Sequence, residues 1–305
     1  MLAFVLRRLG LGIAILLFIS AVVFALTNVA IDPAVTLAGE GATAADVAAV
    51  RQQYGLDRPV VVRYAAWLAA AVRGDFGASF KQHRPVVDVV LERLPVTVML
   101  GCAALAVSLA LSLPLALLAA VRPGGAVDRF GLGLAVLGQA MPSFWLALIA
   151  ILVFSVELGW LPASGSARPV MFIMPALVLG FYATPPILRL TRAGLIEVLR
   201  ADFIRTAQAK GLRPRRVLIR HALSNAVIPV VSVAAVQFGY LLGGSVVIET
   251  IFAMNGIGYL AWQAVSDGDL PVIEALVLIT ALCYVILTLG ADVLNAWLDP
   301  RIRIA

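Results

Sequence analysis

The sequence predicts an all-α integral membrane protein with six transmembrane helices. Of its 305 residues, 62% are hydrophobic and only 13% are charged, whereas soluble domains carry about 25% charged residues. A membrane-spanning helix needs roughly 20 mostly apolar residues. Six stretches meet this length: residues 9–30, 96–121, 131–156, 171–190, 226–248 and 272–295. They do not alternate between apolar and polar residues, so helices are expected rather than barrel strands.

The placement of basic residues predicts the topology. They gather before the first stretch, between the second and third, between the fourth and fifth, and after the sixth. The residues are Arg7, Arg8, Arg122, Arg129, Arg200, Arg205, Lys210, Arg213, Arg215, Arg216, Arg220, Arg301 and Arg303. Because basic loops remain in the cytoplasm, both termini are expected there. The net charge of +6 is thereby explained by orientation, and no nucleic-acid partner is expected.

Residues 1–30 are expected to form a retained transmembrane helix, because the apolar run is too long for a signal peptide. Residues 31–95 form the predicted extracytoplasmic loop, with amphipathic helices. Thr43 and Asp46 mark the start of one helix and Gly55 its end, and Pro59 opens the next. The second helix carries an apolar stripe of Val60, Tyr64, Trp67, Leu68 and Ala71. A third short helix is expected at residues 86–94, with Pro95 starting the second span. The loop is expected at the membrane interface, as a lid or as a docking surface.

Residues 96–295 are expected to form a five-helix core that includes a cytoplasmic loop at 191–225, followed by a cytoplasmic tail at 296–305. Prolines inside the third and fourth spans predict kinks there, since each proline removes one helical hydrogen bond. They are Pro142, Pro175, Pro185 and Pro186.

Ionisable residues are expected only near the ends of the spans, where long side chains reach the interface. These are Glu157, Arg189, Glu249, Glu274 and Asp292. A chain without charge at depth shows no means of using an ion gradient. The main deep polar residues are Gln139 and Gln237, which either join helices by hydrogen bonds or line a pathway. With Met141 they are the candidate pathway residues.

Catalytic motifs are missing from the sequence. There is no phosphate-binding G-x-x-x-x-G-K-[ST], no zinc-binding H-E-x-x-H and no G-x-S-x-G turn. His83 and His221 fall on opposite sides of the membrane in this topology. No catalytic residue, metal site or bound cofactor is therefore expected, and the energy for any transport must come from a partner.

The segment from Arg200 to His221, RADFIRTAQAKGLRPRRVLIRH, predicts a short helix at the membrane surface. Asp202 is expected to cap its start, Gly211 to end it in a left-handed conformation, and Pro214 to open the next helix. Phe203, Ile204 and Ala207 give the helix an apolar patch suited to a groove on a cytoplasmic partner. The alternative is a basic loop that only sets orientation or binds anionic lipid.

At these residues the sequence resembles a known family. RTAQAKGL from Arg205 and the following RRVLIRHALSNAVIP are similar to the EAA loop of binding-protein-dependent ABC importer permeases, in the dipeptide/oligopeptide/nickel branch. Similar segments follow in the same order as in that branch over nearly the whole chain. They are GLDRPVVVRYAAWLAAAVRGDFGASF, RPVVDVVLERLPVTVML, MPSFWLALIAILVFSVELGWLPASG, VIETIFAMNGIGYL and LDPRIR. Two departures from the general pattern are Arg205-Thr206-Ala207 in place of Glu-Ala-Ala, and Leu223-Ser224 in place of Leu-Pro.

The resemblance implies a type I importer permease (MetI-like) fold in a bacterial inner membrane. It also implies a second, similar permease, two cytoplasmic ATPase subunits that use ATP and magnesium, and an extracytoplasmic binding protein. The residues implied in coupling to the ATPases are Asp202, Phe203, Arg205, Thr206, Ala207, Lys210 and Gly211.

Other classes stay open from the sequence. An ion-driven carrier or channel would transport without an ATPase, and an intramembrane enzyme or assembly factor would act as the isolated chain. Within the importer hypothesis, the resemblance favours peptides as substrate, with nickel or another small solute as the alternative.

Overall fold

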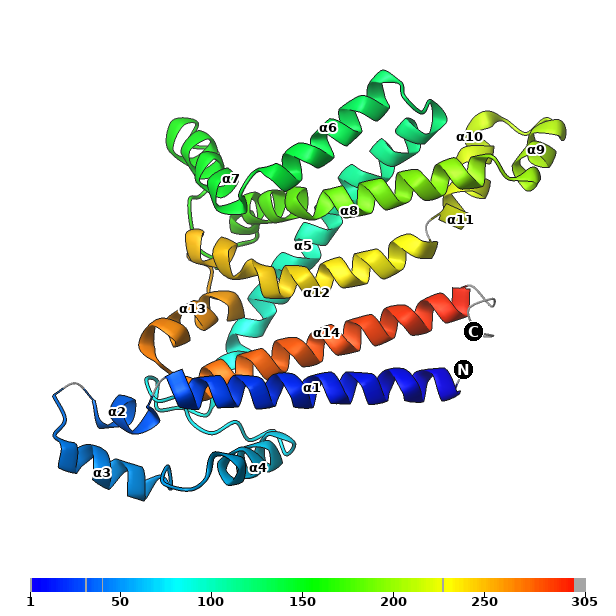
Figure 1. Ribbon diagram of the computed structural model, residues 1–305. Coiled ribbons are helices and arrows are strands. Elements are labelled where there is room, and N and C mark those ends of the chain that lie inside the picture. The colour runs from blue at the N-terminus through cyan, green and yellow to red at the C-terminus, as the bar shows by residue number, and fades with distance from the viewer. Residues whose placement is uncertain (1, 31, 40, 227, 299–305) are drawn as a thin grey trace.

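The computed structural model describes residues 2–30, 32–39, 41–226 and 228–298, and within these ranges the chain is built of helices (Figure 1). The outer loop contains α2 (Pro33–Ala38), α3 (Ala44–Gln53) and α4 (Val60–Ala71), and it follows α1 (Leu2–Ala30). The later elements are α5 (Val86–Val121), α6 (Ala126–Ala140), α7 (Ser143–Ala150), the π-helix η1 (Ile151–Glu157), the 3₁₀-helix η2 (Pro169–Phe172), α8 (Ile173–Leu199), α9 (Asp202–Ala209), α10 (Pro214–Arg216), the π-helix η3 (Val217–Leu223), α11 (Ser224–Ala226), α12 (Ile228–Ile251), α13 (Ile257–Asp267) and α14 (Leu270–Leu298). Arg301 and Arg303 lie outside the described residues.

The helices account for the predicted spans in two ways. Four are continuous and long enough to cross a membrane: α1, α5, α8 and α14. The other two spans are bent pairs, one made by α6 with α7 and η1, the other by α10–α11 with α12. The fold class predicted from the sequence is therefore confirmed, and two of its six spans are broken.

The third span is broken where the sequence places Pro142. Its two halves, Ala126–Ala140 and Ser143–Glu157, differ in direction by 99°. Met141 and Pro142 at the break have extended backbone, with ψ of 128° and 135°. A residue before proline disfavours the helical conformation, which explains why the helix stops at Ala140.

The expected third helix of the outer loop is instead the beginning of the second span. α5 runs without a break from Val86 to Val121, with Pro95 and Pro114 inside it. Its first turn is held by burial, because Val86, Val89 and Val90 are at most 2% exposed and pack against α13 and α14. That burial outweighs the hydrogen bond lost at Pro95.

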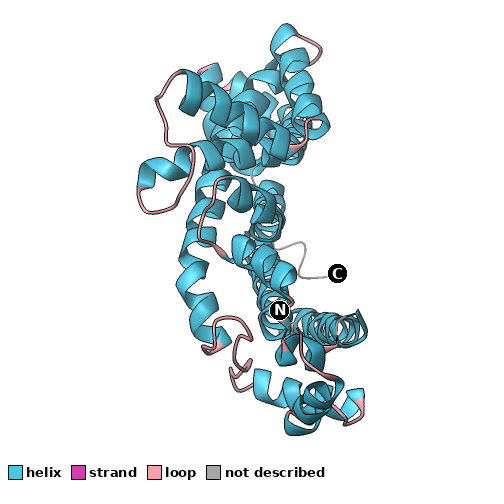
Figure 2. Cartoon of the chain, turned by 90° about the vertical axis from the view of Figure 1, so that its left-hand side faces the viewer, coloured by secondary structure: helices cyan, strands magenta, loops and turns pink. Residues whose placement is uncertain are grey.

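Three apolar clusters form the core, and α5 contributes to each. The first cluster joins α5 to α7, α8 and α12. The second joins the far end of α5 to α8, α9 and η3. The third joins the start of α5 to α13 and α14. Seen in Figure 2, the helices extend from the α6–α8 group at one edge to the α1–α4 group at the other.

The outer loop forms the two helices expected before α5. Thr43 and Asp46 make a reciprocal capping box at the start of α3, and the hydrogen bonds from the Thr43 side chain and amide lower the pKa of Asp46. Gly55 follows α3 with φ of +62°, as expected for a helix end.

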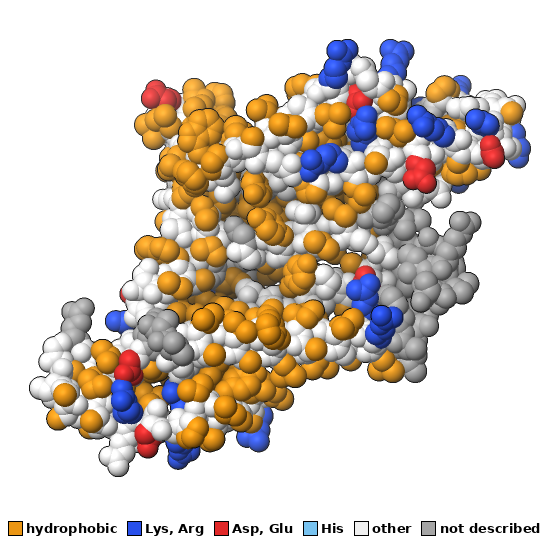
Figure 3. Space-filling view, in the orientation of Figure 1, with side chains coloured by type: hydrophobic (Ala, Val, Ile, Leu, Met, Phe, Trp, Pro, Cys, Tyr) orange, Lys and Arg blue, Asp and Glu red, His pale blue; other side chains and the backbone are white. Residues whose placement is uncertain are grey.

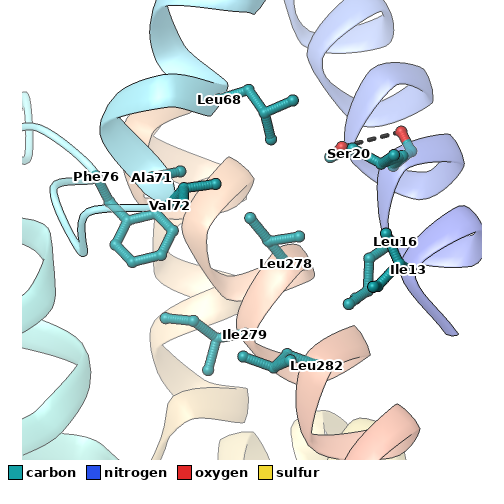
Figure 4. A pocket seen from close by; sticks show the side chains of 11 residues that line it. Ile13, Leu16, Ser20, Leu68, Ala71, Val72, Phe76, Leu278, Ile279 and Leu282 are labelled. Carbon is teal, nitrogen blue, oxygen red and sulfur yellow. Dashed lines mark hydrogen bonds between the residues drawn. The ribbon is translucent and has the colours of Figure 1, made fainter. Parts of the chain in front are cut away.

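Part of the apolar stripe of α4 packs against α1. Tyr64 and Trp67 contact the ring of Phe24, and the hydroxyl groups of Tyr64 and Ser20 are 2.8 Å apart. Below these rings, an apolar cavity of about 310 Å³ lies between α1, α4 and α14, with Leu68 and Leu278 in its walls (Figure 4). These contacts attach the outer loop to the half of α1 that contains Ser20 and Phe24.

The two ends of the molecule differ in character. α9, the first residues of α1 and the end of α14 lie at one end, which we call the α9 end; α2, α3 and α13 lie at the other (Figure 1). At the opposite end, Asp269 accepts hydrogen bonds from the backbone N–H groups of Phe80 and Lys81, so it fixes the loop before α5 against the connection between α13 and α14.

Candidate functional site

The short helix expected in the basic segment is α9, with its start one residue earlier than predicted. It runs from Asp202 to Ala209, and Ala201, in extended conformation, occupies the cap position. No side chain makes a capping hydrogen bond, so the prediction that Asp202 caps the helix is wrong. Asp202 lies in the first turn instead, where a carboxylate is favoured by the helix dipole.

The other end of α9 is closed by the residues that the sequence predicts. Gly211 has φ of +76°, a conformation that costs other residues about 1–2 kcal/mol. Its N–H donates to the carbonyl of Gln208 at 2.9 Å, and the N–H of Leu212 donates to Ala207 at 3.3 Å. This pair of bonds is a Schellman motif, which ends the helix sharply.

The inner face of α9 is packed into the protein. Ile204 is fully buried and Ala207 is 7% exposed, in the cluster that includes Leu195 and Val217. The expectation that Ile204 and Ala207 belong to a free apolar patch is therefore wrong. Short helices gain most of their stability from packing, and here that packing is to the chain's own helices.

The outer face of α9 is free within the described part of the chain. It presents Asp202, Phe203, Arg205, Thr206 and Lys210, all exposed, with Phe203 46% accessible. Arg205 lies 3.5 Å from Asp202 in a solvated ion pair. An exposed aromatic ring among mixed charges is a surface of the kind that anchors protein contacts.

Beyond α9, the structure contains a carboxylate whose burial the sequence did not indicate. Glu249 of α12 is completely buried, although a glutamate near a span end was expected to reach the interface. It accepts hydrogen bonds from Thr97 at 2.7 Å, Ser245 at 2.9 Å and the N–H of Tyr259 at 3.0 Å. The Thr97 hydroxyl also accepts from the N–H of Ile257 at 2.8 Å. This glutamate network joins α5, α12 and α13.

The two glycines after Glu249 allow this network to form. A Cβ atom on Gly256 would lie 2.3 Å from a Glu249 oxygen, and one on Gly258 would lie 2.8 Å from the Cα of Val246. The signal in the sequence was therefore an acidic residue in an apolar run followed closely by N-G-I-G. Glu274, in the first turns of α14, is also buried, and it accepts a hydrogen bond from Thr27 at 2.8 Å.

A second missed pair lies near the α9 end. Asp128 of α6 is 2% exposed and forms an ion pair with Arg192 of α8, whose side chain is 23% exposed. One carboxylate oxygen also accepts from the N–H of Gly124 at 2.7 Å. The pair fixes the start of α6 on α8, beside the second apolar cluster.

Replacing Asp128 with alanine is expected to destabilise the chain by about 3 kcal/mol, because Arg192 would lose its partner in a largely buried site. Asparagine at the same position keeps an acceptor for Gly124 and should cost less. Thermal unfolding of the purified protein measures both variants. Equal midpoints for the wild-type and alanine proteins would show that the pair does not stabilise the fold.

The candidate pathway residues lie away from α9. Gln139 is exposed at the end of α6, Met141 is half-buried at the break before α7, and Gln237 is half-buried in α12. Neither glutamine makes a side-chain hydrogen bond within the described residues, so the structure gives no support for a role in joining helices. Their role in a pathway stays a prediction.

Comparisons with known proteins agree over the whole length. Residues 1–101 match the N-terminal part of binding-protein-dependent transport system membrane components, and residues 112–304 match the binding-protein-dependent transport system inner membrane component family. A putative peptide transport system permease protein of Brucella abortus (strain 2308) is 37% identical over 312 residues, and a glutathione transport system permease protein, GsiC of Escherichia coli (strain K12), is 40% identical over 304. Each alignment covers 99% of both chains.

Among solved structures, the chain is similar to one from the MetNI methionine ABC transporter in an inward-facing conformation. The TM-score is 0.56 with 20% sequence identity, over 69% of this chain and 96% of that chain. At this identity the similarity concerns the fold alone.

Proposed function

Because the chain belongs to the family of binding-protein-dependent transport system inner membrane components, we propose that it is the permease subunit of an importer for di- or oligopeptides and that α9 couples it to an ATPase. As a family member it is a multi-pass membrane permease of an ABC importer. The substrate, the coupling site and the orientation are the parts that we propose.

The single observation that carries the coupling site is the division of α9 into two faces. Ile204 and Ala207 attach it to α8 and η3 through the second apolar cluster. Phe203, Arg205 and Thr206 point away from that cluster and stay accessible. A partner that binds the outer face and moves would displace the whole helix. Because the inner face is packed against α8 and η3, these elements would move with it. Such rigid-body motion is how packed helices switch between two states.

The partners that we propose are those implied by membership of this family. A second, similar permease would enclose the pathway with this chain, and two ATPase subunits would bind the α9 helices of the pair. An extracytoplasmic binding protein would deliver the substrate at the opposite end, where α2 and α3 lie. ATP and magnesium would be held by the ATPases, and this chain would contribute no catalytic residue.

This function places the α9 end and both termini in the cytoplasm. The basic residues of the segment from Arg200 to Arg220 support that orientation, since cytoplasmic loops carry an excess of arginine and lysine. Peptides are supported as substrate by the names of the relatives, which are peptide and glutathione transport permeases. Nickel or another small solute is the alternative.

Truncating Phe203 to alanine is expected to weaken association with the ATPase subunits by about tenfold or more, because an exposed aromatic anchor is lost. Ile219→Ala is the matched control, since Ile219 of η3 is also 46% exposed but lies outside α9. Co-purification of the ATPases and ATP-driven peptide uptake in proteoliposomes measure the effect. If both variants behave alike, α9 is not the coupling site.

A further inference from the structure

A cavity of about 750 Å³ lies beside α9, at the end of two spans. Its apolar wall comes from the last turns of α5 and α8 and from η3. The wall residues are Ala120, Val121, Ile196, Leu199, Val217 and Leu218. Gln208 of α9 and Leu212 of the following turn close one side. An occupant of this cavity would therefore contact the spans and the loop helix together.

Two arginines lie at the rim of this apolar cavity. Arg200 and Arg215 line it, both are exposed, and neither forms an ion pair in the part of the chain that the structure describes. Figure 3 shows Lys and Arg side chains gathered at this end of the molecule. Two of the nearby carboxylates are already paired, Asp128 with Arg192 and Asp202 with Arg205, and Glu197, one turn before Arg200 on α8, forms no ion pair within the described residues.

The shape and charge of the cavity select one class of ligand. An anionic headgroup would pair with the two arginines, and an apolar chain attached to it would pack against the apolar wall. A free phosphate ion would use only the rim, and an acidic protein segment would cover the wall only if it also carried apolar side chains. α5 and α8, two helices long and apolar enough to cross a membrane, both end beside the cavity. A cavity at the end of two spans is within reach of lipid headgroups if that end lies at the membrane surface.

We propose that this cavity binds an anionic phospholipid of the inner leaflet, with its phosphate on Arg200 and Arg215 and an acyl chain against Val121, Leu199 and Leu218. The proposal rests on the proposed function, which places the α9 end in the cytoplasm. The lipid would fill the space between α9 and the spans, so it would stiffen the connection through which the ATPase acts. Import would then depend on anionic lipid in the membrane.

The test compares two double variants with the same net charge in the intact importer complex. Arg200→Gln/Arg215→Gln removes the rim arginines, and Arg216→Gln/Arg220→Gln removes two exposed arginines of the same segment that do not line the cavity. Native mass spectrometry counts phosphatidylglycerol molecules retained by each complex as the lipid is titrated. A basic residue near an anionic surface contributes about fivefold in affinity. The rim variant should therefore bind one phosphatidylglycerol about thirtyfold more weakly, with the control unchanged.

Three results would overturn the proposal. Equal retention by the two variants would mean that the segment attracts anionic lipid without a site. Displacement of the lipid by inorganic phosphate at equal concentration would mean that the apolar wall contributes nothing. Absence of retained lipid in the wild-type complex, with ATPases bound, would assign the cavity to a partner. Failure of the ATPases to co-purify with the wild-type chain would refute the proposed function instead, whatever the lipid result.

Discussion

Glu249→Ala is expected to have the largest effect of any single substitution on the stability of this chain. The carboxylate accepts hydrogen bonds from the Thr97 hydroxyl and from the N–H of Tyr259. In the alanine variant, both donors would lose this acceptor. Ser245 keeps the carbonyl of Leu242 as a second acceptor at 3.1 Å. Each unsatisfied buried donor costs about 1–3 kcal/mol, to which the cavity left by the side chain adds.

The measurement is the midpoint of thermal unfolding in detergent, which should fall by roughly 10 °C or more for a loss of this size. Glu249→Gln should be intermediate, because it keeps one acceptor but turns an amide N–H toward a donor. Glu92→Ala is the control: this glutamate of α5 forms only an exposed ion pair with Arg84. A similar midpoint for Glu249→Ala and Glu92→Ala would mean that the network does not hold the three helices together.

Ala207→Asp is expected to abolish ATP-driven uptake while leaving the chain in the membrane. The aspartate would place a charge in the apolar cluster under α9, which costs several kcal/mol. Detachment of α9 from the spans would expose this charge to water and so remove that cost. The detached helix would expose the backbone after Arg205 and Lys210 to trypsin. Uptake, ATPase co-purification and limited proteolysis therefore report the same event.

Ala209→Asp is the matched control for this experiment, because Ala209 is exposed on the same helix two residues later. Its aspartate lies near the helix C-terminus, where the dipole penalty is about 0.3–1 kcal/mol. Loss of uptake in Ala207→Asp without any new tryptic cleavage would refute the detachment mechanism. Equal loss in both variants would mean that added charge, and not burial, is responsible.

The sequence predicted the class of fold and the six apolar segments because apolar length is a strong local signal. It could not decide which prolines interrupt a helix. Pro142 ends α6, whereas Pro95 lies inside α5, because the first turn of α5 is held by contacts with α13 and α14 that are distant in sequence. The difference between these two prolines is a matter of tertiary packing.

The short helix α9 was predicted in position, but its buried and exposed faces were not. Gly211 identified the end of α9 correctly, since a left-handed residue after a helix is a local requirement. The inner and outer faces could not be assigned, because Ile204 is buried by α8 and η3 and not by its neighbours in sequence. Glu249 was misread for the same reason: its three donors come from α5, α12 and the start of α13.

The participation of α5 in all three apolar clusters has a mechanical consequence. With 36 residues at about 1.5 Å each, this helix is about 54 Å long. If α5 tilted as a rigid body by about 10° about its middle, each end would move by roughly 5 Å, and the two ends would move in opposite directions. A movement at the end of α5 that joins the outer loop would therefore be transmitted directly to its other end beside α9, through this single helix.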